Sequence, residues 1–304
     1  MVQLRTAIPA RAPAATIRVA GIAISHPERP IAQAPGHTKL DVVRYHERMG
    51  AWLVPQLAPR PIAVVKCMDG HFDDCFFQKH ATWRRVDDEE ESPPFLRMAD
   101  GADVVRAVQN GGFEFHTWGA SFPRLERPDR ITLDLDPDSA LSWSVMQDAA
   151  ARVRALLDSL ELRWFLKTTG GKGLHFVLPI TRRHTWPEAK AFARGIAETL
   201  AHRMPALFTA TVSKEARAGR IYVDYLRNAD GATAVAAYSL RARPGLPVSM
   251  PVAWNELGAA DLRGNHFNID NVEATIAARR ADPWANYDRS RQTIAASIRR
   301  AVNA

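Results

Sequence analysis

The sequence has few cysteines, few lysines and no long apolar run. Its two cysteines, Cys67 and Cys75, are too few for a disulfide framework or a zinc knuckle, and they favour a reduced, cytosolic compartment. No uncharged apolar stretch approaches the ~18 residues that a membrane-spanning helix needs. Residues 1–20 lack the apolar core of a signal peptide. We therefore expect a cytoplasmic protein with no membrane partner.

Acidic residues are outnumbered by basic ones. The 304 residues include 40 Lys and Arg against 33 Asp and Glu, a net charge of +7 that favours a polyanionic partner such as nucleic acid. Only seven of those cations are lysines. Arginine suits bidentate contacts with phosphate, but codon usage in a GC-rich genome explains the same excess. The arginine content therefore leaves both explanations open.

The spacing of apolar residues predicts strands and helices that do not alternate strictly. We expect strands over residues 61–66, 113–118, 130–136, 165–167, 174–178 and 221–226, with 17–24 as a first strand and 234–238 extending the sheet that holds 221–226. Helices are expected over 39–53, 103–109, 142–160, 186–203 and 290–302. The fold class is α/β, with mixed sheets flanked by helices. Residues 1–20 are predicted to be a leader or linker remnant, and 21–304 one domain.

Three acidic residues lie within apolar strands. Asp134 and Asp136 are two positions apart, so their side chains face the same side of a strand, about 7 Å apart. Asp224 is the third. Mg²⁺ or Mn²⁺ would neutralise such a set, and two-metal phosphoryl transfer uses one. The alternatives are an exposed strand face for the first two and an ion pair with Arg227 for the third.

A glycine-rich segment, Lys167-Thr-Thr-Gly-Gly-Lys-Gly-Leu-His175, joins two predicted strands. Its glycines allow backbone N–H groups to approach an anion, with Thr169, Lys172 and His175 beside them. The spacing is not that of a Walker A loop, and a plain hairpin turn is the alternative. Other candidates to contact a phosphate are His116, Arg227 and Arg241. A structural histidine and a generic basic surface are their alternatives.

Two further patterns concern DNA. Lys66-Cys-Met-Asp-Gly70 differs by one residue from the K-x-D-G motif of DNA ligases, and we reject that interpretation. Phe76 and Phe77 are candidates to stack on bases, although aromatic residues of this kind are usually buried in a core.

Together these segments resemble the archaeo-eukaryotic primase superfamily, and more closely the polymerase domain of bacterial ligase D. The resemblance covers about residues 22–302 and rests on Ile24-Ser-His-Pro27, Phe115-His-Thr-Trp118, Leu133-Asp-Leu-Asp-Pro137, Leu166-Lys-Thr-Thr-Gly-Gly-Lys-Gly-Leu-His175, Asp224-Tyr-Leu-Arg-Asn228 and 232–245. It implies a fold of the primase-polymerase type. It also implies that Asp134, Asp136 and Asp224 hold two ions of Mn²⁺ or Mg²⁺.

The same resemblance assigns the binding residues. Contacts with an NTP or dNTP fall to His116, Thr169, Lys172, His175, Arg227 and Arg241. Lys39 matches a residue that holds a DNA 5′-phosphate, while the second residue of that kind, near Glu28 and Arg29, is left open. Phe76 or Phe77 is expected to stack on template DNA.

We therefore expect a template-dependent nucleotidyltransferase that fills gaps and extends 3′ ends at double-strand breaks in bacterial non-homologous end joining. The resemblance implies association with the nucleoid, and Ku and ligase or nuclease modules as partners. The alternatives are a primase that starts chains de novo and a catalytically silent DNA-end-binding module.

Overall fold

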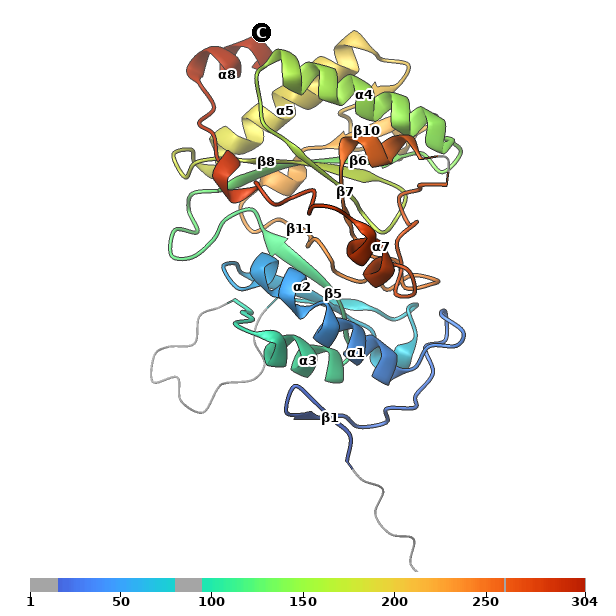
Figure 1. Ribbon diagram of the computed structural model, residues 1–304. Coiled ribbons are helices and arrows are strands. Elements are labelled where there is room, and N and C mark those ends of the chain that lie inside the picture. The colour runs from blue at the N-terminus through green and yellow to red at the C-terminus, as the bar shows by residue number, and fades with distance from the viewer. Residues whose placement is uncertain (1–15, 80–94, 260, 304) are drawn as a thin grey trace, which may run out of the picture.

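Two β-sheets, each with its own layer of helices, meet across the centre of the molecule (Figure 1). The computed structural model describes residues 16–79, 95–259 and 261–303. Within these ranges, one sheet has six strands, one has four, and a two-stranded hairpin lies at the N-terminal side. The predicted α/β class with mixed sheets flanked by helices is confirmed.

The larger sheet carries the three acidic residues. Its strand order is β12-β7-β8-β6-β10-β9, antiparallel throughout except for β9 beside β10. The strands are β6 (Arg130–Pro137), β7 (Phe165–Thr168), β8 (Leu174–Pro179), β9 (Phe208–Thr209), β10 (Ile221–Asp224) and β12 (Pro251–Val252). Helices α4 (Trp143–Ser159) and α5 (Trp186–Arg203) cover one face of this sheet (Figure 1).

Alternation along β6 explains which face is free. Ile131, Leu133 and Leu135 are fully buried, and α5 packs on β6. Because successive residues of a strand point to opposite faces, Asp134 and Asp136 lie on the face away from the helices. The sheet thus has a dry face against α4 and α5 and a polar face toward the second sheet.

The smaller sheet has the order β11-β5-β3-β4 and is antiparallel. Its strands are β3 (Ile62–Lys66), β4 (Phe76–Gln78), β5 (Gly112–Trp118) and β11 (Thr233–Val235). Helices α1 (Lys39–Arg48), α2 (Gly50–Leu57) and α3 (Gly101–Gln109) lie beside it (Figure 1). The predicted helix over 39–53 is therefore two helices, joined at Met49, where Gly50 weakens the helical preference of the chain.

Three other expectations differ from the structure. Residues 17–24 form a hairpin of β1 (Arg18–Val19) and β2 (Ile22–Ala23) rather than one strand. The segment 234–238 belongs to the other sheet, because β11 pairs with β5 rather than extending the sheet of β10. Strand β10 ends at Asp224, two residues earlier than predicted. The Asn228 side chain makes hydrogen bonds at 2.8 Å with both the N–H and the carbonyl of Thr132, so β10 cannot pair with β6 there.

The remaining elements are short, apart from a C-terminal helix. They are η1 (Met68–Gly70), α6 (Lys214–Arg217), η2 (Leu226–Asn228), η3 (Trp254–Gly258), α7 (Val272–Ala278), η4 (Asp288–Ser290) and α8 (Ala296–Asn303), which begins later than predicted. In the described ranges, no helix has the length and apolar character to cross a lipid bilayer.

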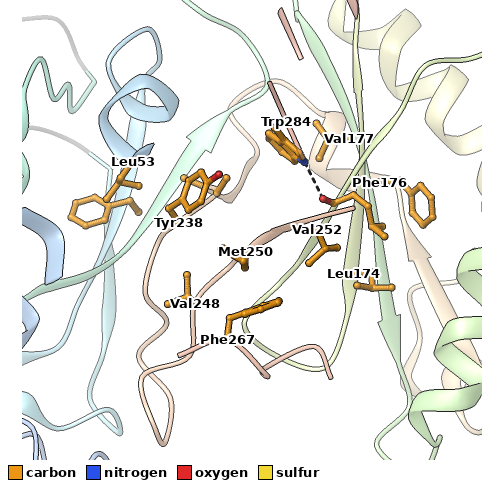
Figure 2. Close-up of a cluster of buried hydrophobic side chains, with 14 of the residues drawn as sticks. Leu53, Leu174, Phe176, Val177, Tyr238, Val248, Met250, Val252, Phe267 and Trp284 are labelled. Atoms are coloured by element: carbon orange, nitrogen blue, oxygen red, sulfur yellow. Dashed lines mark hydrogen bonds between the residues drawn. The ribbon is translucent and has the colours of Figure 1, made fainter. Parts of the chain in front are cut away.

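An apolar cluster occupies part of the space between the sheets (Figure 2). Leu53 of α2 lies on one side of it and Val177 of β8 on the other, with Tyr238 and Met250 between them. Trp284 closes this cluster, donating its indole N–H to the Leu166 carbonyl at 2.9 Å. The contact fixes the C-terminal segment against β7.

A buried ion pair also links the two sheets. Arg60, which precedes β3, lies 2.7 Å from Asp129, which precedes β6, and their side chains are 4% and 0% exposed. Burial lowers the pKa of Arg60 to about 10. Burial opposes ionisation of Asp129 as well, but the charges of Arg60 and Arg130 outweigh it and lower the pKa of that carboxyl to about 2. Both groups are therefore charged, and the pair fixes the position of one sheet relative to the other.

The two cysteines are joined. Cys67 and Cys75 form a disulfide across a separation of eight residues, so the prediction of two reduced cysteines is wrong for this structure. The cause is the β3–β4 hairpin: Lys66 pairs with Phe76, which places the next residue of each strand, Cys67 and Cys75, opposite one another.

Candidate active site

A row of ionisable side chains crosses four strands of the larger sheet. Lys167 of β7 pairs with His175 of β8, His175 pairs with Asp134 of β6, and Asp134 pairs with Asp224 of β10. Directly paired residues of antiparallel strands share a face. The four side chains therefore lie side by side on one face of the sheet. Asp136 lies on the same face, two residues further along β6 than Asp134.

Arginines pair with all three acids. The Arg227 Nε lies 3.3 Å from Asp134 and 3.2 Å from Asp224, so it bridges these two carboxylates. Asp136 is turned toward Arg217, at 3.4 Å, and its side chain is 55% exposed. Arg227 is placed by the turn η2, which Asn228 anchors to β6.

The carboxylates differ in their affinity for protons. Burial opposes ionisation of Asp134, but the neighbouring His175 and Arg227 hold the pKa of its carboxyl well below the usual range. Burial and the charge of Asp134 raise the pKa of Asp136. Burial also raises the pKa of Asp224, against the opposing charge of Arg227. The acids therefore disfavour one another's charge, which an added cation would relieve.

The donor chemistry of these acids fits a hard divalent cation. Carboxylate oxygens are the ligands that Mg²⁺ and Mn²⁺ prefer, and two of the three carboxylates already flank one cationic nitrogen, that of Arg227. No three His, Cys, Asp or Glu side chains in the described residues are already gathered closely enough to hold a metal ion. Asp136 would therefore have to turn from Arg217 to join the other two.

A cavity of about 350 Å³ lies above the row, between the two sheets. Asp134 and Asp136 line it, whereas Asp224 reaches it only through Arg227. The structure brings together on its walls all the residues predicted to contact a nucleotide, which are His116, Thr169, Lys172, His175, Arg227 and Arg241. Arg243 is a further cation there that the sequence did not single out.

The glycine-rich loop is held by its own threonine. Thr169 Oγ1 accepts hydrogen bonds from the N–H groups of Gly171 and Gly173, each at 3.2 Å. A Cβ at Gly173 would collide with the Leu135 carbonyl oxygen, so only glycine lets the loop approach β6 this closely. The expectation that these amides face an anion is wrong for Gly171 and Gly173, whose N–H groups point to Thr169. Lys172, which is exposed, presents the charge instead.

His175 is the most enclosed of the predicted nucleotide contacts. Its side chain is 3% exposed, and its Nε2 lies 3.3 Å from Asp134. Its Nδ1 is buried without a hydrogen-bond partner in the described residues. Lys167, which sequence reasoning missed, is buried next to it and donates to Ser249 Oγ at 2.6 Å. Burial holds the pKa of Lys167 well below its ordinary value.

Glu114 joins the two sides of the cavity, and the sequence analysis did not identify it. Its carboxylate accepts hydrogen bonds from His116 Nε2 at 2.8 Å, Arg241 Nε at 2.9 Å and the Ala242 N–H at 2.9 Å. Burial opposes its ionisation, but these donors and the charge of Arg241 lower the pKa of Glu114 to about 2. The period-two spacing of Glu114 and His116 on β5 is the sequence signal that could have found it.

A second cavity, of about 540 Å³, is lined by Lys39, the residue predicted to hold a DNA 5′-phosphate. Arg29 lines the same wall, as do His26 and Lys66. Lys39 donates its Nζ to the Ser25 carbonyl at 3.0 Å, and burial together with the charge of Arg29 lowers the pKa of Lys39. The cavity thus concentrates positive charge away from the acidic row.

Phe76 and Phe77 lie on β4, at the edge of the smaller sheet. They are 50% and 55% exposed, unusual for phenylalanine, so they are not core residues. The Phe77 ring lies 5.1 Å from the His116 ring, which connects this edge to the nucleotide-sized cavity. Phe77 is therefore an exposed aromatic side chain beside that cavity and is available for stacking, whereas Phe76 points to the opposite face of the strand.

Comparison with known proteins identifies the class. The solved structure of the polymerase domain from Mycobacterium tuberculosis ligase D in complex with DNA matches with a TM-score of 0.78 and 26% identity, over 88% of this chain and 98% of that one. The fold is of the archaeo-eukaryotic primase type, and the chain is by class a DNA nucleotidyltransferase. The family model for the LigD primase-polymerase domain matches residues 38–284. The chain belongs to this family.

Full-length relatives are longer than this chain. The multifunctional non-homologous end joining protein LigD of Pseudomonas aeruginosa is 45% identical over 98% of this chain, and that of Mycolicibacterium smegmatis is 30% identical over 86%. The chain spans 36% of the length of each. The similarity therefore concerns one part of those proteins.

Proposed function

We propose that the chain adds nucleotides from NTPs or dNTPs to a primer 3′-hydroxyl, under the direction of a template, at gaps and ends in DNA. The observation that carries the proposal is the row of Asp224, Asp134, His175 and Lys167, which places acids and cations side by side under one cavity. Acids alone would repel both DNA and nucleotide. Acids next to arginines and a basic loop suit phosphoryl transfer.

Asp134, Asp136 and Asp224 would hold two divalent ions, Mn²⁺ or Mg²⁺. When bound, such ions lower the pKa of the attacking hydroxyl and neutralise the leaving pyrophosphate. The chain itself places the three carboxylates through the pairing of β6 with β10. Arg227, which now bridges two of them, is free to turn toward the nucleotide phosphates once another cation neutralises the acids.

The triphosphate would lie against the cations of the cavity. Lys172 belongs to the glycine-rich loop, and Arg241, from the segment after β11, packs on the same loop and donates to the Thr169 carbonyl. His116 and Arg241 share Glu114, which keeps both oriented. Thr169 acts by shaping the loop, and the unpartnered Nδ1 of His175 is available to a polar group of the substrate.

The second cavity would bind the 5′-phosphate at the far side of a gap. Lys39 and Arg29 supply two cations on one wall, which suits a phosphate monoester. Phe76 and Phe77 lie at the edge of the same sheet and would stack on template bases between the two cavities. This arrangement supports action at gaps rather than on open single strands.

We further infer a role in bacterial non-homologous end joining, which the names of the relatives state for those proteins. Ku and modules with ligase or nuclease activity are the partners this role requires, and association with the nucleoid follows from it. The support is the family, together with a site that fits DNA ends.

Single-nucleotide incorporation on a gapped duplex tests the proposal. The assay compares a 5′-phosphorylated with an unphosphorylated gap, Mn²⁺ with Mg²⁺, and NTPs with dNTPs. We expect templated incorporation that the 5′-phosphate stimulates. Dinucleotide synthesis on unprimed single-stranded DNA would favour a primase, and tight binding to phosphorylated gaps without incorporation would favour a silent end-binding module. Either result would overturn the proposal.

A further inference from the structure

The disulfide lies between the two DNA-binding features of the smaller sheet. Cys67 is 1% exposed and lines the cavity that contains Lys39 and Arg29. Cys75 is partly exposed and directly precedes Phe76. Because Lys66 and Phe76 are the last pair of the β3–β4 hairpin, the bond closes the loop over residues 68–74 at its base.

That loop forms one wall of the Lys39 cavity. Asp69 lies 2.5 Å from Arg29, and Gly70 accepts a hydrogen bond from the Ala32 N–H at 3.2 Å. Met68, Asp69 and Gly70 all line the cavity. The position of Arg29 therefore depends on a segment whose two ends are tied by the disulfide.

Apart from the disulfide, the loop is held by noncovalent contacts: the Phe72 N–H donates to Gln33 Oε1 at 3.2 Å, and the Phe72 ring lies 5.2 Å from the Phe113 ring. The side chains of Asp69 and Arg29 are 70% and 32% exposed, and an exposed ion pair of this kind contributes little. Gln33 donates to Asp73 only at 3.4 Å. The disulfide adds a covalent restraint to this wall.

We propose that Cys67 and Cys75 form a reversible redox-modification site, at which a dithiol reductant opens the disulfide and thereby weakens the 5′-phosphate cavity. This inference rests on the proposed function of that cavity. The site couples the redox state of the surroundings to the affinity for a DNA end that carries a 5′-phosphate.

The chemistry is thiol–disulfide exchange. A thiolate of the reductant attacks Cys75 Sγ, the more exposed sulfur, and forms a mixed disulfide while Cys67 leaves as a thiolate and takes up a proton. The second thiol of the reductant then attacks the mixed disulfide and releases Cys75 as a thiol. Two electrons pass to the protein, and the reductant ends as its own disulfide.

Binding measurements in both redox states test the site. The protein is oxidised with diamide or reduced with dithiothreitol, its thiols are counted by alkylation and mass spectrometry, and its affinity is measured for one gapped duplex with and without the 5′-phosphate. The two cysteines are the only ones in the chain, so any thiol-dependent effect has one source. The double variant Cys67→Ser/Cys75→Ser is the matched control.

We expect the affinity ratio between phosphorylated and unphosphorylated gaps to fall about fivefold or more on reduction, and the double variant to behave like the reduced protein in both conditions. Equal ratios well above one in the two states of the wild-type protein, or thiols that never pair under oxidation, would overturn the redox site. A ratio near one in both states would instead refute the 5′-phosphate cavity itself. Because the wild-type protein alone decides between these outcomes, a poorly folded variant does not obscure them.

Discussion

Replacing Glu114 by Gln tests whether one buried carboxylate positions the nucleotide-binding side chains. The substitution keeps the shape of the side chain and removes its charge. Glu114 accepts from three donors, which lie on His116, Arg241 and Ala242. An amide has one acceptor oxygen, so its NH₂ group must face at least one of these donors. Arg241 then loses its buried counter-charge and is held only by its contact with the Thr169 carbonyl, so its side chain can shift along the cavity wall.

The structure sets the size of the effect. The Glu114 side chain is 7% exposed, so solvent screens its contacts little. Losing a buried charge-assisted contact, with Arg241 still bound to the Thr169 carbonyl, costs about 2–4 kcal/mol of unfolding free energy. A displaced Arg241 should raise the KM for the nucleotide about tenfold, equivalent to about 1.4 kcal/mol. Affinity for a gap with a 5′-phosphate should not change, because the cavity proposed to bind that phosphate is separate from Glu114.

Steady-state incorporation, DNA binding and denaturant unfolding provide the readouts, with the exposed Glu126→Gln as the control variant. The pH dependence adds a further test. The pKa of Glu114 is lowered to about 2 from 4.5, so its stabilisation is complete above about pH 4.5 and disappears as the pH falls toward 2. The variant should lack this component. An unchanged nucleotide KM would refute the positioning role, and a parallel loss of DNA affinity would show general misfolding instead.

Three further predictions concern stability and DNA binding. Arg60→Met should lower the unfolding free energy by about 3–5 kcal/mol at pH 7. This loss should shrink as the pH falls from 3.8 to about 2, the pKa of Asp129 in the folded protein, because Asp129 becomes protonated over that range. A loss under about 1 kcal/mol at pH 7 would contradict the buried pair. Burial lowers the pKa of His46 to about 4 from 6.5. As the pH falls, His46 is therefore protonated in the unfolded chain before it is protonated in the folded protein, and about 3 kcal/mol of stability should be lost between those pH values. A His46→Gln variant with the same pH profile of stability would disprove this. Lys39→Ala and Arg29→Ala should each reduce the salt dependence of binding to phosphorylated gaps by about one counterion, and unchanged slopes would place the 5′-phosphate elsewhere.

Local patterns predicted most of the elements that form the site. Strict alternation over 130–136 indicated both the strand and the face on which Asp134 and Asp136 lie, and β6 confirms it. Helical periodicity located α4 and α5 within one residue of their ends. These features depend on neighbours in sequence, so the sequence alone reveals them.

Pairing between distant segments was not predictable in this way. The row from Lys167 to Asp224 depends on the register of four strands, which no local pattern determines. The same reason explains why 234–238 was assigned to the wrong sheet, and why the disulfide was missed, since it requires the Lys66–Phe76 pairing. Arg29 was left open because it joins Lys39 only through the fold.

The most direct test of the account is single-nucleotide incorporation by Asp134→Asn on a 5′-phosphorylated gapped duplex with Mn²⁺. DNA binding is measured in parallel, and Asp148→Asn, whose side chain is 52% exposed on α4, is the control. The account predicts a loss of more than about a hundredfold in incorporation rate with DNA binding retained. Incorporation at the wild-type rate would contradict the assignment of the acidic row as the catalytic centre.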